Sequence, residues 1–541
     1  MTADDGMGEV TDLLQQLIRN KCVNDGTIGS GHEVRSVETL SAYLAGPGVE
    51  VQRYEPAPGR GNLVMRVEGS DTSAPTLCYM GHIDVVPVDP AGWQRDPFAG
   101  DLVDGVVWGR GAIDMLCLTA SMAVATKRLL GNGWRPRGTL IYLAVADEEA
   151  LGTYGAQWLV DNEWDAVRCD MLITEFGGAR LPIGSTPKLP IMVAEKGSHW
   201  TRLRVRGTPG HGSAPYKSDN AVVKLAEVVR RIAAYKPPTV MDDLWTGFID
   251  GLDLPLAERT LLKTGPGLEV ALGRMPVGIA RLLHAATHTT FSPNVAQGGV
   301  KTNIIPDNAD VAIDIRTLPG VNAEAVHAML RDALGDLWSA VEVAEEGDNP
   351  ASASPTDTDL WRALERVTDR LVPGAATVPM LLVGATDARF FRRKGVTAYG
   401  YGLFSDQIPF NEFGRMLHGN DERIDQASLR LMVDLWEGAA RSCSTRSISD
   451  RVPIALVRRL SSGNATQRSL ARRPAGGRAH PRSAGTHGER RGPPMQYVVR
   501  RDNDRLPPQH HEDAWRTHRV GDAVHRPERR LLPDGSRGLL L

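Results

Sequence analysis

Cysteine is scarce in this chain of 541 residues, and long apolar runs are absent. The cysteines form no CxxC pair, and several lie in apolar segments where a thiol acts as a small hydrophobe. This usage favours a reduced compartment. No run of about 18 apolar residues exists, and the N-terminus has no basic segment followed by an apolar stretch. We therefore expect no membrane span and no signal peptide, and we predict a cytoplasmic protein.

Lysine is missing from the last part of the chain. Residues 441–541 contain 21 Arg and 9 acidic residues, a net charge of +12, so that the remainder carries −15 within the total of −3. The segment has no apolar periodicity and is rich in Pro, Gly, His and Ser, which predicts a disordered Arg-rich tail. An out-of-frame extension and a nucleic-acid-binding tail are the alternatives. The second is the weaker hypothesis, because aromatic residues are not interleaved and no known motif is present.

Before this tail, short apolar runs alternate with helical periodicity, which predicts an α/β fold. The hydrophobic content of 42% is sufficient for two or three structural units in a chain of this length. The predicted strands are 62–67, 76–80, 139–145 and 171–174, and the predicted helices are 8–29, 33–44, 116–130 and 153–162.

Between residues 195 and 347 the pattern changes to that of a separate α+β unit. Its predicted strands are 200–205, 289–295, 309–316 and 341–343, and its predicted helices are 220–234 and 323–334. Helical patterns at 359–371 and near 428–439 then continue the α/β pattern of the first part of the chain. We therefore predict one domain in two parts, 1–194 and 348–440, with 195–347 inserted between them and the tail 441–541 following.

Three predicted strands run directly into polar residues that can bind a metal ion. These residues are His82, the run Asp147-Glu148-Glu149, and Glu175. In open α/β sheets, ligands bind at the carboxyl ends of the strands, because the loops converge there on a rigid support. Taken singly, each motif is more often a surface or capping feature. Their convergence at one sheet edge favours a metal site.

Two further residues extend this set of donors. Asp114 opens a predicted helix after Gly109-Arg110-Gly111, and His418 lies in the run Met416-Leu417-His418-Gly419. Two imidazoles and three carboxylates can hold two zinc ions if one carboxylate bridges them. Mixed nitrogen and oxygen donors suit Zn²⁺, with Co²⁺ or Mn²⁺ as substitutes.

Eight motifs, in this order, give the chain a family resemblance. They are GHIDVVPV, WGRGAID, ADEEA, ITEFGG, GTPGHGSAP, TNIIPDNADVAIDIRTLPG, GATDARFF and LHG. Over roughly residues 10–440 the sequence resembles the di-zinc peptidase family of aminoacylase, succinyl-diaminopimelate desuccinylase and carboxypeptidase G. The long inserted segment with AEKGS is most similar to the carboxypeptidase S branch. The resemblance implies a catalytic domain with a mixed sheet flanked by helices, and an inserted ferredoxin-like lid that serves dimerisation.

The resemblance also implies how the donors divide between two zinc ions. His82, Asp114 and Glu175 bind one ion, and Asp114, Glu149 and His418 bind the other, with Asp114 bridging. Glu148 is left as the implied general base, which takes a proton from the metal-bridging water during attack on the amide carbonyl.

Other implied roles lie around the metal ligands. Asp84 orients the His82 imidazole, with a plain salt bridge as its alternative. His211, in the Gly-His-Gly loop of the inserted segment, stabilises the oxyanion and reaches the site from a partner subunit in many dimeric relatives; alone it reads as a solvated loop histidine.

Substrate-binding residues are implied on both sides of the inserted segment. Asn303 and Arg316 match polar lid positions, and Arg316 is the natural clamp for a substrate carboxylate. Arg389 is the other candidate for binding this carboxylate. For either arginine, the alternative is a salt bridge that only stabilises the fold. Gly384 is expected to leave backbone room beside the substrate.

The sequence departs from the family directly after the bridging aspartate. Met115-Leu116-Cys117 stand where relatives often carry a lysine and a glycine, so the start of this helix is expected to pack differently. The Asp114-Met115 peptide bond is expected to be cis, as in the family.

Hydrolysis of an N-acyl amino acid or a short peptide is the function that the sequence favours. A non-peptide amide such as a ureido compound is the nearest alternative, because it would use the same residues. A phosphoesterase is disfavoured, because there is no glycine-rich phosphate loop and the net acidic remainder repels phosphate.

Overall fold

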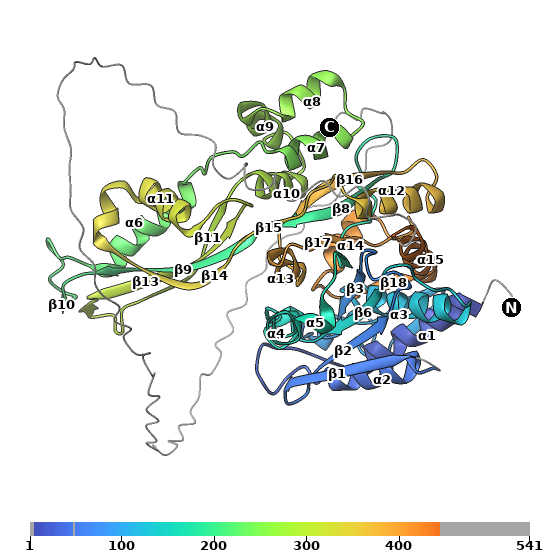
Figure 1. The fold of residues 1–541 in the computed structure, drawn as a ribbon. Helices are drawn as coiled ribbons and strands as arrows, with labels where there is room; N and C mark the ends of the chain where they lie inside the picture. Colours follow the sequence, from blue (N-terminus) through green and yellow to red (C-terminus); the bar gives the residue numbers. More distant parts are fainter. Residues whose placement is uncertain (1–4, 47–48, 444–541) are drawn as a thin grey trace, which may run out of the picture. The chain divides into compact units, whose positions relative to one another are not determined.

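The largest element of the protein is a nine-stranded mixed sheet, seen in a computed structural model that describes residues 5–46 and 49–443 (Figure 1). In spatial order its strands are β1 (Glu50–Ala57), β2 (Arg60–Val67), β6 (Leu140–Val145), β3 (Leu77–His82), β7 (Met171–Thr174), β17 (Thr397–Gly400), β8 (Lys188–Glu195) and β15 (Ser352–Ala353), with β16 (Ala376–Leu382) paired to β8. The four strands β6, β3, β7 and β17 run parallel at the centre. The predicted α/β fold with a mixed sheet is therefore confirmed.

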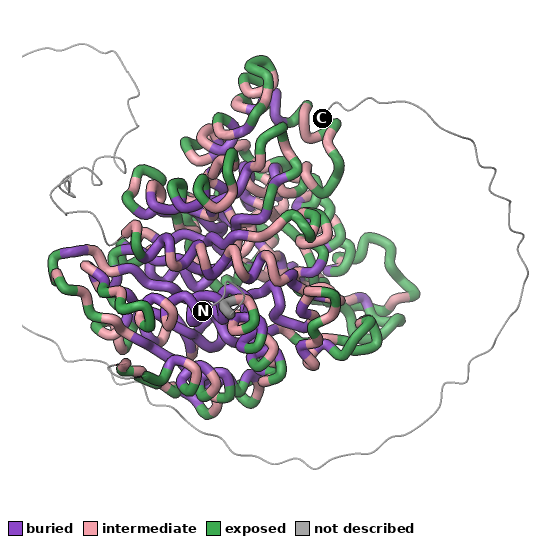
Figure 2. Tube along the Cα trace, turned by 90° about the vertical axis from the view of Figure 1, so that its right-hand side faces the viewer, coloured by how far each residue is buried: buried purple, intermediate pink, exposed green. Residues whose placement is uncertain are grey.

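Helices cover both faces of this sheet. One face carries α1 (Asp5–Arg19), α2 (Val34–Leu44), α3 (Leu116–Gly131), α12 (Asp359–Leu371) and α15 (Gln426–Cys443), and the other carries α4 (Ala156–Asn162), α5 (Trp164–Val167) and α13 (Ala388–Arg393). Side chains alternate along β3, so that Leu77 and Tyr79 join the first layer while Cys78 and Met80 join the second. Every residue of β3, β6 and β7 is buried. Figure 2 shows the buried segments in purple in the interior of the molecule.

A four-stranded antiparallel sheet forms the second layered unit, with strand order β11-β13-β9-β14. Its elements are β9 (Gly197–Arg206), β11 (Thr290–Gly298), β13 (Asn308–Thr317), β14 (Val341–Asn349), α6 (Ala221–Ala234) and α11 (Ala323–Leu334). Leu203 and Val205 of β9 face a core shared with both helices, whereas Arg204 and Arg206 between and after them are exposed. Figure 1 shows α6 and α11 together on one face of the sheet.

Four helices between α6 and β11 pack against the nine-stranded sheet. They are α7 (Asp243–Gly251), α8 (Leu256–Leu262), α9 (Gly265–Leu272) and α10 (Val277–Thr287). Trp245 and Phe248 of α7 share a buried cluster with Val378 and Met380 of β16. The predicted inserted segment 195–347 therefore contributes to two cores, because its middle part buries its apolar faces on the other sheet.

The buried Lys196 connects the start of this segment to the end of α10. It lies between β8 and β9, and its Nζ donates to the carbonyl oxygens of Ala285 at 3.0 Å and His288 at 2.7 Å. The link between the two sheets at β8–β9 is thus hydrogen-bonded to the chain that leaves α10.

Small sheets and short helices complete the described chain. They are β4 (Asp101–Val103), β5 (Val106–Trp108) and β18 (Arg423–Asp425) in one sheet, β10 (Gly210–His211) and β12 (Ile304–Ile305) in another, α14 (Phe410–Met416), and the 3₁₀ turns Pro90–Gly92, Glu148–Ala150 and Gly335–Ala340. The pairing of β18 with β5 matters for the site, because it brings the chain after His418 beside the chain before Asp114.

The predicted elements are largely confirmed, with one clear error near the N-terminus. The predictions 171–174, 323–334 and 359–371 coincide with β7, α11 and α12. The predicted helix 8–29 instead ends at Arg19, because Val23 forms a bridge with Val85 and the Asn24 amide donates to Asp84. The predicted tail 441–541 lies almost wholly outside the described residues. No helix within the described ranges is long and apolar enough to cross a membrane.

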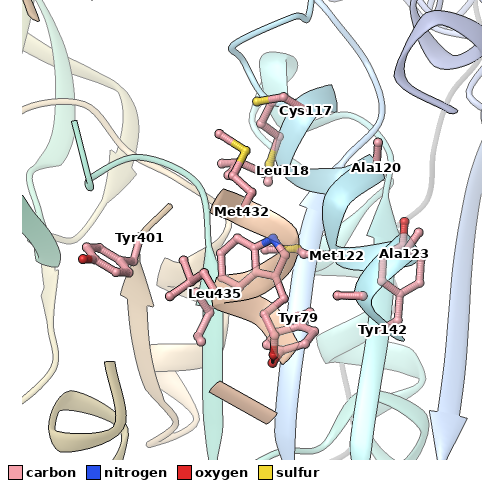
Figure 3. Close-up of a cluster of buried hydrophobic side chains, with 14 of the residues drawn as sticks. Tyr79, Cys117, Leu118, Ala120, Met122, Ala123, Tyr142, Tyr401, Met432 and Leu435 are labelled. Carbon is pink, nitrogen blue, oxygen red and sulfur yellow. Dashed lines mark hydrogen bonds between the residues drawn. The ribbon is translucent and has the colours of Figure 1, made fainter. Parts of the chain in front are cut away.

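The core between α3 and α15 is built around Trp436. Its indole is fully buried, its Nε1 donates to Ser121 Oγ at 2.9 Å, and its carbonyl oxygen accepts from the Tyr79 hydroxyl at 2.5 Å. Figure 3 shows Leu118 and Met122 of α3 with Met432 and Leu435 of α15 in this cluster. Helix α15 is therefore fixed to β3, a central strand of the sheet.

We expect Trp436→Ala to reduce the free energy of unfolding by about 3–5 kcal/mol, because it leaves a large cavity beside Tyr79. Chemical denaturation followed by circular dichroism measures this change. The exposed Trp200 of β9 offers a matched control, and Trp200→Ala should have a smaller effect. Equal losses for the two variants would contradict the packing described.

Candidate metal centre

The candidate site lies where the central parallel strands end. His82 is the last residue of β3, the turn Glu148–Ala150 follows β6, and Glu175 follows β7 directly. These strands are hydrogen-bonded neighbours with the same direction, so their ends meet at one edge of the sheet. The structure therefore brings together the strand-end residues that the sequence predicts.

Two groups of donors share the Asp114 carboxylate. His82 Nε2 lies 3.2 Å from Asp114 Oδ1 and 3.4 Å from Glu175 Oε2. His418 Nε2 lies 3.4 Å from Asp114 Oδ2 and 3.1 Å from Glu149 Oε2. The ligand atoms within each group of three lie within 4.8 Å of one another. Each oxygen of Asp114 thus faces a different imidazole, which is the arrangement of a bridging carboxylate.

A buried carboxylate holds the loop that carries Asp114. Glu422 Oε1 accepts from the backbone N–H groups of Ile113 at 2.7 Å and Asp114 at 2.9 Å, and Oε2 accepts from Gly111 N at 3.0 Å and Arg110 Nη1 at 2.8 Å. The predicted cis peptide between Asp114 and Met115 is confirmed. Glu422, between His418 and β18, therefore fixes the loop that carries Asp114.

Asp84 organises the site differently from the sequence expectation. The nearest acceptor for His82 Nδ1 is the backbone oxygen of Asp84 at 2.9 Å, while the carboxylate oxygen lies 3.6 Å away. The Asp84 carboxylate instead accepts from the N–H groups of Glu148 at 3.2 Å and Glu149 at 3.1 Å, and from the Asn24 amide at 2.8 Å. Asp84 therefore positions the two glutamates through their backbone.

Crowded carboxylates dominate the electrostatics of the site. Burial, reinforced by the charge of Glu175, raises the pKa of Glu148 well above its ordinary value. Burial likewise raises the pKa of Glu175 to about 8, with a further contribution from Asp114 against the opposing effect of His82. Burial also raises the pKa of Asp387 to about 7. Burial is the largest cause of each shift, and neighbouring carboxylates add to it.

The shared carboxylate behaves in the opposite way. Burial alone would raise the pKa of Asp114. Hydrogen bonds with His418 and His82 instead hold this pKa below its usual range. Hydrogen bonds with Asp114 and Glu149 raise the pKa of the exposed His418 to about 10. Asp114 is thus the carboxylate that stays ionised between the two imidazoles.

The residues present fit bound metal ions. Glu149 Oε1 is buried and has no hydrogen-bond partner, and neither oxygen of Asp387 has one. Unpartnered buried acceptors are costly unless a cation or water satisfies them. Nitrogen and carboxylate donors in two groups of three suit a pair of divalent ions.

The predicted oxyanion residue lies in the small sheet formed by β10 and β12. His211 is exposed, and its Nδ1 accepts from Ser213 N at 3.2 Å and lies 2.7 Å from Ser213 Oγ. The Asn303 backbone oxygen accepts from Gly212 N at 2.8 Å, so Asn303 and His211 share one loop cluster. Within the described residues, no hydrogen bond or ion pair connects His211 to the metal-binding groups.

The two predicted arginine clamps occupy different surroundings. Arg316 on β13 is partly exposed and binds Asp314 Oδ1 at 2.7 Å, with its guanidinium 6.0 Å from the Trp200 ring. Arg389 is buried, and its guanidinium donates to the carbonyl oxygens of Thr386 and Leu151. Arg389 therefore supports the loop after Glu149, which leaves Arg316 as the more accessible cation. A Cβ added at Gly384 would meet no atom within 4 Å, so the chain itself does not require glycine there.

Sequence reasoning missed Glu422 and Asp387. Glu422 lies four residues after His418, and Asp387 lies inside the quoted motif GATDARFF, but neither position differs in pattern from an ordinary surface acid. Only the fold reveals that Glu422 binds backbone N–H groups and that Asp387 is buried near Glu148.

Curated relatives cover most of this chain. Aminoacylase-1 of Homo sapiens is 28% identical over 396 residues, which is 72% of this chain and 85% of the relative. The N-fatty-acyl-amino acid synthase/hydrolase PM20D1 of Xenopus tropicalis is 27% identical over 402 residues, which is 71% of this chain and 76% of the relative.

Solved structures share the fold. An M20 family metallo-carboxypeptidase, Sso-CP2, from Sulfolobus solfataricus superposes with a TM-score of 0.59 at 18% identity, covering 82% of this chain and 99% of that protein. Human carnosine dipeptidase 1 gives a TM-score of 0.56 at 18% identity, with 82% and 97% covered.

The family model described as peptidase family M20/M25/M40 matches residues 78–442, which include all five predicted metal ligands. The family predicted from the motifs is thereby confirmed, while the carboxypeptidase S branch stays a prediction. The chain is a hydrolase of the metallopeptidase and amidohydrolase type, and it belongs to the M20/M25/M40 peptidase family.

Proposed function

We propose that this protein is a zinc-dependent hydrolase that cleaves the amide bond of an N-acyl amino acid or a short peptide. The observation that carries the proposal is the pair of donor groups that share Asp114 beside the buried carboxyl of Glu148. His82, Glu175 and Asp114 would hold one ion, and Asp114, Glu149 and His418 the other. When bound, two such ions polarise the amide carbonyl and make water acidic enough to act as a nucleophile near neutral pH.

Glu148 is the proton carrier in this proposal. Its backbone N–H is held by Asp84, and its side chain belongs to neither group of metal donors. Burial and the charge of Glu175 raise its pKa, and a raised pKa makes a carboxylate a stronger proton acceptor. Glu148 then passes this proton to the leaving amine nitrogen.

The relatives support the choice of substrate class. Aminoacylase-1 and an N-fatty-acyl-amino acid synthase/hydrolase are named for amides of amino acids, and carnosine dipeptidase is named for a dipeptide. All such substrates can present a free carboxylate next to the cleaved bond. Arg316, partly exposed beside Trp200, is the cation that we assign to this carboxylate.

His211 completes the proposed machinery from a second subunit. The hydrogen bonds of its imidazole are made only to Ser213 in the same loop, and the residue is exposed, which suits a side chain that acts on a neighbouring chain. We propose a homodimer formed through the inserted segment, in which His211 of one chain stabilises the oxyanion at the other chain's site.

Metal removal tests the proposed function directly. Treatment with a chelator should reduce the release of free amino acid from N-acyl amino acids or dipeptides by at least about a hundredfold, because the carbonyl loses its polarising ions. Zinc should restore the rate at about two ions per chain. Full activity of the metal-free protein would contradict the proposal.

Glu148 and Glu149 should respond differently to the same substitution. Glu148→Gln removes the proton acceptor and leaves all metal donors, so turnover should fall by at least about a hundredfold while zinc content stays at the wild-type value. Glu149→Gln should instead lower zinc content, because it weakens a ligand. Metal analysis and turnover, measured on both variants, check the assignment. An exchanged pattern would mean that Glu149 is the base and Glu148 the ligand.

Arg316→Ala should raise the KM for a substrate with a free carboxylate by about tenfold to a hundredfold, the usual value of a hydrogen-bonded charge pair. The amidated analogue of that substrate should be unaffected by the substitution. Steady-state kinetics on both substrates provide the comparison, and Arg204→Ala, an exposed arginine on the adjacent strand β9, is the matched control. Equal losses on the two substrates would reject the clamp.

A further inference from the structure

A second cluster of metal-binding side chains lies on the four-stranded sheet, outside the candidate metal centre. It consists of His199 on β9, His327 on α11 and Glu345 on β14, and their ligand atoms lie within 4.8 Å of one another. The His199 and His327 rings meet edge to face with centroids 6.0 Å apart. Three elements that are distant in the sequence therefore place donors at one point.

A β-bulge in β14 creates this convergence. Glu345 pairs with Thr201 and Asp348 pairs with His199, but the register shifts between Glu345 and Gly347. Residues three apart on a regular strand point to opposite faces, whereas the extra residue turns Glu345 and Asp348 to the same face. That face is the one that His199 occupies and that α11 covers.

Asp348 prepares His199 as a ligand. The His199 Nδ1 lies 3.2 Å from Asp348 Oδ1, and a carboxylate in this position fixes the proton on Nδ1. The Nε2 atom is then left with a lone pair. The His199 side chain is 1% exposed, and its Nε2 has no hydrogen-bond partner. A buried acceptor without a partner is the feature that a bound cation would satisfy.

The other two donors lie on the side open to solvent. Glu345 Oε1 lies 3.2 Å from His327 Nε2 and 3.9 Å from His199 Nε2, and the His327 and Glu345 side chains are 30% and 45% exposed. Ligands about 2 Å from one zinc ion are at most about 4 Å apart, so small rotations of the two outer side chains close the group. The two outer donors therefore leave the group accessible from solvent.

We propose that His199, His327 and Glu345 form an accessory binding site for a divalent transition-metal ion, for which zinc is the probe. Two imidazoles and one carboxylate are donors that suit zinc, and Asp348 supplies the supporting carboxylate behind the first histidine. The bound ion connects the edge strand β14 and helix α11 to the interior strand β9. An ion pair of Glu345 with His327 alone would leave His199 Nε2 unsatisfied. The proposal does not depend on the proposed function.

Zinc analysis of the full-length protein tests this site. Wild type, His327→Gln and Glu345→Gln are stripped with a chelator, dialysed against buffered zinc, and measured by mass spectrometry of the metal. Both variants should bind about one zinc ion per chain fewer than wild type, with unchanged hydrolytic turnover. Glu346→Gln is the matched control, because Glu346 is adjacent on β14 but binds Arg202 at 2.5 Å. The control should retain the wild-type zinc content.

Equal zinc content in wild type and both variants would overturn the proposal. It would also be overturned if both variants lost turnover together with zinc, because the residues would then act on the hydrolytic centre. Circular dichroism of the zinc-free proteins checks that the variants fold. If His327→Gln fails to fold, Glu345→Gln still tests the proposal. The Glu345 side chain is 45% exposed, so its substitution should not prevent folding.

Discussion

The concentration of negative charge at the end of the central strands is the constraint on which the rest of the site depends. Five of its carboxyl groups, those of Asp114, Glu148, Glu149, Glu175 and Asp387, are largely removed from water around two imidazoles. Like charges at such separations repel strongly when little water screens them. Divalent cations would offset this repulsion, so the arrangement of carboxylates favours metal binding.

Holding these groups together requires rigid backbone support, which two further carboxylates supply. Asp84 accepts backbone N–H groups from the glutamate turn, and Glu422 accepts them from the loop before the bridging aspartate. In both cases a buried anion is satisfied by hydrogen bonds and by a fixed loop conformation, not by a metal. The candidate metal ligands are thus positioned by acids that belong to neither donor group.

The parts of this arrangement that the sequence predicts are those with a local signal. His82 and Glu175 follow apolar runs directly, and their strands proved to be parallel neighbours, so their meeting at one sheet edge could be foreseen. Glu422 and Asp387 have no such signal, because their burial arises from contacts with distant segments. The two-residue spacing predicts that the Asp84 carboxylate lies near His82. That this carboxylate accepts from the N–H groups of Glu148 and Glu149 depends on the conformation of the turn after β6, which the spacing does not show.

The packing of α7 is the part of the fold that the sequence predicts least. An amphipathic helix shows that one face is buried but does not show against which surface. The apolar face of α7 carries Trp245 and Phe248, which pack against β16 of the nine-stranded sheet. Nothing in their spacing shows that α7 packs there and not on the four-stranded sheet, whose strands and helices flank it in the sequence. The ordered motifs nevertheless identify the family, since they depend on chemistry at fixed positions and not on helix packing.

The return of α7 to α10 to the nine-stranded sheet has a mechanical consequence. The chain passes between the two sheets at four places: β8 to β9, α6 to α7, α10 to β11, and β14 to β15. Lys196 at the first passage is hydrogen-bonded to Ala285 and His288 at the third, so bending one of these passages strains or breaks its hydrogen bonds to the other. A rotation of one sheet relative to the other would therefore involve all four passages, and it would carry the first and third together or break the hydrogen bonds between them.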